Sequence, residues 1–215
     1  MATLDIISKR NEKLANKVIT NLKSRHFDAY YAENREKALE IAVSLINKNG
    51  TVSWGGTMTA QEIGLFNYLK ENGYNCIDRD KAKTDEEREQ ILKDATFADT
   101  FIMSSNAVSY DGQLVNIDGT GNRVAAMIFG AKSVIMIVGM NKLAPTLEDA
   151  ISRARNVAAP LNIQRFQQKN TPCMHTGACG DCKSADCICC HEVITRVSRV
   201  EGRIKVILVN DDLGL

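Results

Sequence analysis

The sequence of 215 residues has little net charge, few aromatic side chains and no long apolar run. Because 27 Lys and Arg residues nearly balance 26 Asp and Glu residues, no basic field is available to attract nucleic acid or an anionic membrane. Apolar stretches such as residues 133–140 are far too short to cross a bilayer, and residues 1–10 lack the apolar run of a signal peptide. We therefore expect a cytoplasmic protein without a membrane span or a nucleic-acid partner.

Only three prolines are present, and no linker rich in serine, glycine or proline divides the chain. With 44% hydrophobic residues, the chain can bury a substantial core. The composition changes abruptly near residue 171, where cysteines become frequent. The sequence therefore predicts an α/β domain over residues 1–170, a cysteine-rich metal-binding loop over 171–191, and a C-terminal β-hairpin over 192–215 that completes the same domain.

Hydrophobic periodicity predicts helices that alternate with strands. Helical spacing indicates helices over residues 4–25, 36–47, 85–96, 121–129 and 146–158, and a further one from the glycine pair after residue 54 to about residue 71. Short apolar runs indicate strands over 51–54, 74–77, 100–104 and 133–139. Asp111-Gly112 predicts one hairpin turn, and Glu201-Gly202 a second turn between strands near 193–200 and 203–209. This alternation predicts an α/β fold in which a mostly parallel sheet carries helices on both faces.

Ligands of such sheets bind outside the carboxyl ends of the strands, which points to the loops after Trp54, Ser104, Ile117 and Gly139. In the first loop, Gly55 and Gly56 let the backbone approach a ligand closely, and the helix start with Thr57 favours an anion. The alternative is a tight turn in which Thr57 or Thr59 caps the helix. A capping box from Thr59 would give Glu62 a purely structural role.

The loop of residues 116–123 is the second candidate, because it is dense in glycine and polar residues: Asp118, Gly119, Gly121, Asn122 and Arg123. Asp118 could act as a base or accept from a hydroxyl group, Asn122 could clamp a ligand, and the Arg123 fork suits a carboxylate or a phosphate. The alternative has Asp118 as a helix cap and Arg123 in a surface ion pair. Asn106, after another strand, adds a polar contact. The catalytic residue stays open, with Asp118 and Glu62 as candidates, and no nucleotide cofactor motif is present.

Six of the seven cysteines lie between Cys173 and Cys190, while Cys76 is expected in the core. Cytoplasmic thiols stay reduced, so this density favours a metal site over disulfides. A C-x-x-C pair with further cysteines suits tetrahedral zinc or an iron–sulfur cluster, and spacing does not separate the two. A metal-free loop and a redox dithiol are the alternatives. The first-choice ligands are Cys173, Cys179, Cys182 and Cys189, with Cys187, Cys190 and His191 as substitutes.

Several of these segments together resemble the lactate-utilisation (LUD) family. They are Ser53-Trp54-Gly55-Gly56, residues 117–123, residues 153–156 and residues 159–162. The tail, with its Thr-Gly-Ala-Cys-Gly-Asp-Cys run at 176–182, is similar to a stand-alone subgroup of that family, from which Cys187 and Cys190 depart. The resemblance implies a fold like that of ribose-5-phosphate isomerase, glucosamine-phosphate deaminase and CoA transferases. It also implies a role around lactate oxidation, with partner subunits that supply iron–sulfur or other oxidoreductase chemistry.

The function expected from the residues and the resemblance is the binding of a small anionic metabolite linked to lactate utilisation. One alternative is a non-catalytic scaffold, or a docking subunit that depends on redox state or metal. A further alternative is an enzyme like a sugar-phosphate isomerase or a CoA transferase, with Glu62 or Asp118 as its base. Whether the chain is an enzyme and whether it forms a homo-oligomer stay open.

Overall fold

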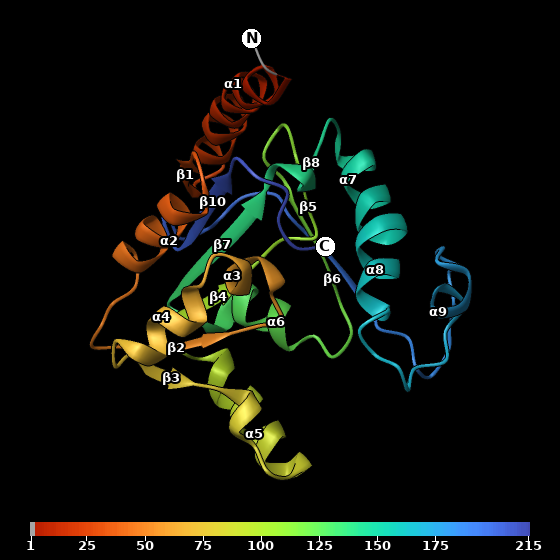
Figure 1. The fold of residues 1–215 in the computed structure, drawn as a ribbon. Helices are drawn as coiled ribbons and strands as arrows, with labels where there is room; N and C mark the ends of the chain where they lie inside the picture. The colour runs from red at the N-terminus through yellow and green to blue at the C-terminus, as the bar shows by residue number, and fades with distance from the viewer. Residues whose placement is uncertain (1–2) are drawn as a thin grey trace.

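The computed structural model describes residues 3–215 and contains a six-stranded sheet whose neighbouring strands are all parallel (Figure 1). In spatial order the strands are β1 (Asp28–Ala32), β10 (Ile204–Val209), β7 (Ser133–Gly139), β4 (Thr100–Met103), β2 (Thr51–Trp54) and β3 (Asn75–Ile77). This sheet confirms the predicted fold class.

Apolar side chains cover both faces of this sheet. Successive side chains of a strand point to opposite faces, so one strand contributes to two apolar clusters. In β7, Val134 and Met136 belong to one apolar cluster, while Ile135 and Ile137 belong to the other. The first cluster packs the sheet against α1 (Thr3–Ser24), α5 (Asp85–Thr96), α6 (Asn122–Ala125) and the π-helical turn η2 (Ala126–Gly130). The second packs it against α2 (Arg35–Ser44), α3 (Met58–Glu62) and α4 (Leu65–Glu71).

Helix boundaries follow local capping. Thr84 accepts the Glu87 N–H at 3.2 Å at the start of α5, whose acidic first turn suits the helix dipole. Thr146 and Asp149 form a capping box at the start of α7 (Leu147–Arg153). The turn η4 (Ala154–Ala158) and α8 (Ala159–Ile163) continue this helix, and α9 (Pro172–Thr176) follows after a loop (Figure 1). Short 3-10 turns are η1 (Arg79–Lys81) and η3 (Met140–Lys142).

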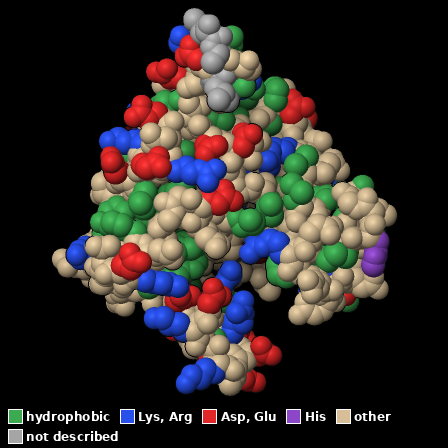
Figure 2. Space-filling view, in the orientation of Figure 1, with side chains coloured by type: hydrophobic (Ala, Val, Ile, Leu, Met, Phe, Trp, Pro, Cys, Tyr) green, Lys and Arg blue, Asp and Glu red, His purple; other side chains and the backbone are tan. Residues whose placement is uncertain are grey.

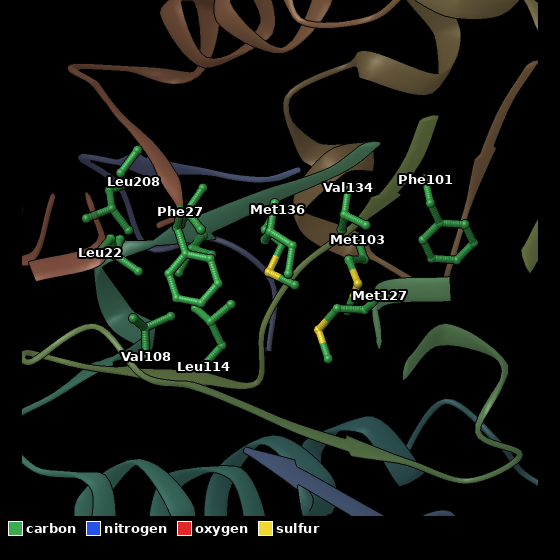
Figure 3. Packing of buried hydrophobic residues seen from close by; sticks show 14 of the residues in the cluster. Leu22, Phe27, Phe101, Met103, Val108, Leu114, Met127, Val134, Met136 and Leu208 are labelled. Atoms are coloured by element: carbon green, nitrogen blue, oxygen red, sulfur yellow. The ribbon is translucent and has the colours of Figure 1, made fainter. Parts of the chain in front are cut away.

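A second sheet of four strands packs on the first apolar cluster. Its order is β8 (Leu143–Ala144), β5 (Ala107–Ser109), β6 (Leu114–Asp118) and β9 (His191–Thr195). Figure 3 shows Val108 and Leu114 of this sheet facing the same apolar region as Phe27 and Met136. The predicted turn at Asp111-Gly112 is confirmed, since β5 and β6 pair in antiparallel fashion and Gly112 has a φ of 89°.

The predicted C-terminal β-hairpin does not form. β9 ends at Thr195 and pairs with β6, whereas β10 lies between β1 and β7 in the other sheet. The reason lies in β10, where every residue except Lys205 is buried, so this apolar strand gains more from two parallel neighbours than from one exposed partner. The turn at Gly202, with a φ of 69°, therefore connects two sheets. Among residues 3–215, no helix is long and apolar enough to cross a bilayer.

Candidate functional site

The loops at the carboxyl ends of β2, β4 and β7, with the loop after β6, meet around a cavity of about 750 Å³. We call it the cationic cavity, because six of its lining residues are basic: Arg79, Arg88, Arg123, Lys142, Arg165 and Lys169. Asp80 and Asp118 are the acidic side chains among the described lining residues. Figure 2 shows this side of the molecule hollowed between the lobes of α5 and α9, with Lys and Arg side chains at the rim. The loops predicted from the strand ends therefore do converge.

Arg123 organises the wall of this cavity. Its buried guanidinium group uses all five N–H groups within the protein, at 2.5–3.2 Å. The acceptors are the Asp118 and Asn116 side chains, the Asn106 amide oxygen, and the carbonyl groups of Ser104 and Ile117. Since each N–H group of Arg123 already has an acceptor in the protein, the guanidinium group has no free pair of N–H groups for a ligand carboxylate or phosphate. The prediction of a ligand fork is replaced by a positioning role, in which Arg123 ties the β4 and β6 loops together.

The glycines of both candidate loops make room for this arrangement. A Cβ atom on Gly55 would lie 2.8 Å from Cδ of Arg123, so only glycine lets the arginine stem pass. Gly121 has a φ of 86°, and its N–H donates to Asp118 Oδ1 at 2.9 Å. Gly119 lies against the backbone of Ile188, 3.4 Å from a built Cβ. Gly55 therefore makes room for a side chain and Gly119 for a neighbouring backbone, while Gly121 supplies a left-handed turn. Their contact with a ligand stays a prediction.

Asp118, which was predicted as a base, has both carboxylate oxygens engaged. Oδ1 accepts from Gly121, and Oδ2 pairs with Arg123 Nε at 3.2 Å. The alternatives of a helix cap and an ion pair therefore describe Asp118 better than a base does. The ion pair with Arg123 is buried and does not lie on the surface as expected. Asn122, which was predicted as a clamp, lines the cavity while its side-chain oxygen accepts from Thr120 at 2.8 Å.

Glu62 is exposed, and its Oε2 accepts the Gly214 N–H at 3.0 Å, which holds the C-terminal segment beside the cavity. Thr57 caps α3 through the Ala60 N–H at 3.4 Å, so the capping box expected from Thr59 is wrong. Thr59 is instead fully buried.

Lys142 is the functional candidate that the sequence did not single out. It is 4% exposed and donates to the hydroxyl groups of Thr59 and Ser104, both at 3.1 Å. Burial lowers the Lys142 pKa to about 7, with help from the charge of Arg153, while Glu62 opposes this shift. Within the described chain no carboxylate forms a salt bridge with Lys142. The sequence feature that could have indicated Lys142 is its position. It follows Gly139, where β7 ends, by three residues, and so lies in a loop at the carboxyl end of a strand.

A second cavity, of about 50 Å³, lies beside the first and is lined by five cysteines: Cys173, Cys179, Cys182, Cys187 and Cys189. We call it the thiol cavity. Cys189 is exposed as a residue, but partial desolvation of its thiol by the neighbouring side chains raises its pKa to about 12, and the charges of the other four cysteines add to the shift. Cys190 lines the cationic cavity, and His191 lies on β9. All four first-choice ligands therefore face one small space.

The thiols do not form a closed ligand set, since no group of three or more His, Cys, Asp or Glu side chains in residues 3–215 is arranged to hold a metal ion. Ile117, Cys187 and Ile188 line both cavities, so they form a shared wall. Cys76 is half-buried on β3 and packs against the second apolar cluster, and burial raises its pKa.

The fold and the cavity define an α/β protein with a basic cavity at the carboxyl ends of parallel strands. The chain belongs to the LUD domain family, whose model matches residues 15–209. A crystal structure of a DUF162 family protein from Deinococcus radiodurans matches with a TM-score of 0.53 and 13% identity, covering 93% of this chain and 98% of that chain.

Ribose 5-phosphate isomerase A from Neisseria gonorrhoeae matches with a TM-score of 0.34 and 18% identity, over 53% of this chain and 54% of that chain. None of the curated proteins matches the sequence. At 13% identity, the Deinococcus radiodurans structure supports the shared fold alone.

Proposed function

We propose that the cationic cavity binds a small anionic metabolite of the 2-hydroxy acid class, with lactate as the candidate ligand, and that Lys142 binds its carboxylate. The observation that carries this proposal is a lysine that is 4% exposed, has hydroxyl partners and lines the cavity. A buried cation without a carboxylate partner is costly, and an anionic ligand would offset that cost. Membership of the lactate-utilisation family supports the choice of lactate.

The pKa of Lys142, lowered to about 7 by burial, lets both protonation states exist near neutral pH. The ammonium form attracts a carboxylate, and the neutral amine accepts a hydrogen bond from the hydroxyl group of the ligand. Thr59 and Ser104 fix the amine from two sides and so limit its rotation. Arg123 holds the surrounding loops and does not bind the ligand carboxylate, because its donors are satisfied.

Binding of lactate to the wild type and to Lys142→Met tests this function by titration calorimetry. We expect the variant to lose at least tenfold in affinity. Lys13→Met is the matched control, because Lys13 is exposed on α1 and outside the residues that line the cavity, and it should bind lactate as the wild type does. Unchanged binding by Lys142→Met, or no binding of lactate by the wild type, would contradict the proposal.

A second candidate function is metal binding in the thiol cavity, favoured by the five cysteines that line it. The donor set suits zinc or an iron–sulfur cluster, with Cys173, Cys179, Cys182 and Cys189 as ligands. Bound zinc would fix the loop, whereas a cluster would supply electron transfer beside the cationic cavity. Because the thiols are not closed into a ligand set, holding an ion requires them to move inward.

Metal analysis and visible absorption of protein purified without oxygen test this candidate. We expect iron with brown colour, or about one zinc per chain without colour, and loss of either in Cys179→Ser/Cys182→Ser. Cys76→Ser is the control, since Cys76 lies on β3 and outside the thiol cavity, and it should retain the metal. Wild-type protein with neither iron nor zinc would exclude the metal and leave a reduced thiol loop or a redox dithiol.

A further inference from the structure

The outer part of the cationic cavity contains three arginines that Lys142 and the Arg123 network do not involve. Arg79 comes from η1, Arg88 from α5 and Arg165 from the segment after α8. We infer that these three arginines form a second anion subsite that takes a phosphate group. The ligand of the cavity would then carry a carboxylate at one end and a phosphate at the other. This inference rests on the proposed function, because the carboxylate end is the one assigned to Lys142.

Arg79 provides the most specific observation. Its side chain is 24% exposed, and its Nε is buried without a hydrogen-bond partner among the described residues. The nearest carboxylate, that of Asp80, is 3.9 Å away and points mostly into solvent, with 71% of its side chain exposed. A Cβ atom on Gly56 would lie 3.2 Å from a terminal nitrogen of Arg79, so the guanidinium group lies over the glycine turn. A buried N–H without an acceptor is unsatisfied, and a small shift of the Arg79 side chain toward a bound anion would give it one.

Arg88 and Arg165 bring like charges toward the same point. Burial lowers the Arg79 pKa, and although Asp80 opposes this, the charges of Arg88 and Arg165 lower it further. Arg165 donates to the Asn162 side chain at 3.2 Å, a neutral partner, and Arg88 has no ion pair in the described part of the chain. The carboxylates near Arg79 are those of Asp80, which is exposed, and Asp78, which already pairs with Lys70 at 2.9 Å. The repulsion among the three guanidinium groups would be relieved by an anion between them.

The charge and the size of the cavity favour a phosphate ester over a simple acid. Arginine forks match the oxygens of phosphate, and a dianion neutralises two of the three charges where a carboxylate neutralises one. Lys169, also in the lining, already pairs with Asp186 at 3.3 Å and so adds little charge. A volume of about 750 Å³ is in the range of cavities that hold ligands much larger than a three-carbon acid.

Titration calorimetry with three probes at constant ionic strength tests the subsite: lactate, inorganic phosphate and 3-phosphoglycerate, a hydroxy acid with a phosphate at its other end. The variants are Arg88→Ala and Arg165→Ala, which avoid removing the more buried Arg79, and Arg199→Ala is the matched control. Arg199 is exposed and outside the cavity lining. Circular dichroism of each variant confirms that it is folded.

We expect 3-phosphoglycerate to bind at least tenfold more tightly than lactate. Arg88→Ala and Arg165→Ala should each lower the affinity for 3-phosphoglycerate and for inorganic phosphate at least fivefold, and should leave the affinity for lactate unchanged. Arg199→Ala should leave the affinity for all three probes unchanged. The subsite is overturned if the phosphate adds no affinity, or if both variants behave like Arg199→Ala. Lactate binding that depends on Lys142, without any gain from phosphate, removes the subsite alone.

In the opposite result, lactate does not bind the wild type, but 3-phosphoglycerate binds and loses affinity in Arg88→Ala and Arg165→Ala. That result would support the phosphate subsite and contradict the proposed binding of lactate. If none of the three probes binds, both proposals fail together.

Discussion

The cationic cavity and the thiol cavity share the wall of Ile117, Cys187 and Ile188, yet they are built in different ways. The first is surrounded by strand ends that a buried guanidinium group ties together with five hydrogen bonds. The second is surrounded by cysteines from a loop and one short helix. The cationic cavity is therefore organised before any ligand arrives, whereas the thiol cavity would need an ion to complete it.

Two buried cations inside the cationic cavity sharpen this contrast. Arg123 has a protein acceptor for each donor, so it is structural. Among the described residues, Lys142 has the hydroxyl groups of Thr59 and Ser104 as hydrogen-bond partners and no carboxylate in a salt bridge, so its charge is not neutralised locally. Burial alone does not distinguish a functional cation from a structural one. The hydrogen-bond partners distinguish them, because Arg123 has a carboxylate and four further acceptors whereas Lys142 has two hydroxyl groups.

Arg123→Met should produce the largest effect, because it removes the residue that organises the cationic cavity. The Asp118 carboxylate would stay buried without its partner, and breaking a buried ion pair costs roughly 3–5 kcal/mol. We expect a loss of this size in the free energy of unfolding in urea, together with loss of lactate binding. Arg199→Met, at an exposed arginine, should change stability by less than about 0.5 kcal/mol. A loss under about 1 kcal/mol for Arg123→Met would show that the loops after β4 and β6 keep their conformation without Arg123.

Lys142→Met should change the pH dependence of stability. Because the folded-state pKa is lowered from 10.5 to about 7, the native state binds fewer protons than the unfolded state between those values. Wild-type stability should therefore rise as pH increases from about 7 to 10, by roughly 3–5 kcal/mol at about 1.4 kcal/mol per pKa unit. The charged neighbours Arg153, Glu62 and Arg123 stay in the variant.

Urea unfolding of the wild type and of Lys142→Met at several pH values measures this difference. The variant should be the more stable protein at pH 6, and its advantage should shrink toward pH 10. Parallel curves for the two proteins would mean that Lys142 titrates normally, which would contradict the uncompensated burial on which its proposed role depends.

Gly55→Ala should have a smaller effect, and Gly56→Ala separates its cause. A methyl group on Gly55 would press on Cδ and Cγ of Arg123 at 2.8 and 2.9 Å, so we expect a loss of about 1–3 kcal/mol. On Gly56 it would meet only the end of the Arg79 side chain at 3.2 Å, which can move. Thermal unfolding should therefore show a smaller loss for Gly56→Ala, and equal losses would argue against a specific contact with Arg123.

The sequence predicted the places of the site better than the roles of its residues. Glycine turns, hairpin signals and alternating apolar runs are local features, so the loops after Trp54 and Ile117 were found at the right strand ends. Lys142 and Arg79 were missed because their importance comes from burial and from the lack of a partner, which depend on segments far away in the chain. Arg123 was found, but its five acceptors were not visible.

The same limit explains the wrong hairpin. Glu201-Gly202 is a turn signal, but a turn does not specify which strands pair. β10 joins β1 and β7, whose paired residues lie 70 or more positions earlier in the chain, because its apolar side chains require a partner on each side. The cysteines were easier to find, since five of the six in residues 173–190 line one cavity as neighbours in sequence.

Ile188→Ala should give the smallest effect, and it tests the wall that the two cavities share. Ile188 is half-buried and lines both, so truncation should cost about 1 kcal/mol and open a path between them. Because Cys179, Cys189 and Cys190 are already exposed, we expect faster reaction with Ellman's reagent at the buried Cys173, while Ile7→Ala, at an exposed position on α1, should leave the rate and the stability unchanged. Saturating lactate should slow the reaction in Ile188→Ala, because the ligand would then block the new path. Equal rates in both variants would show that the cavities are separated by more than this side chain.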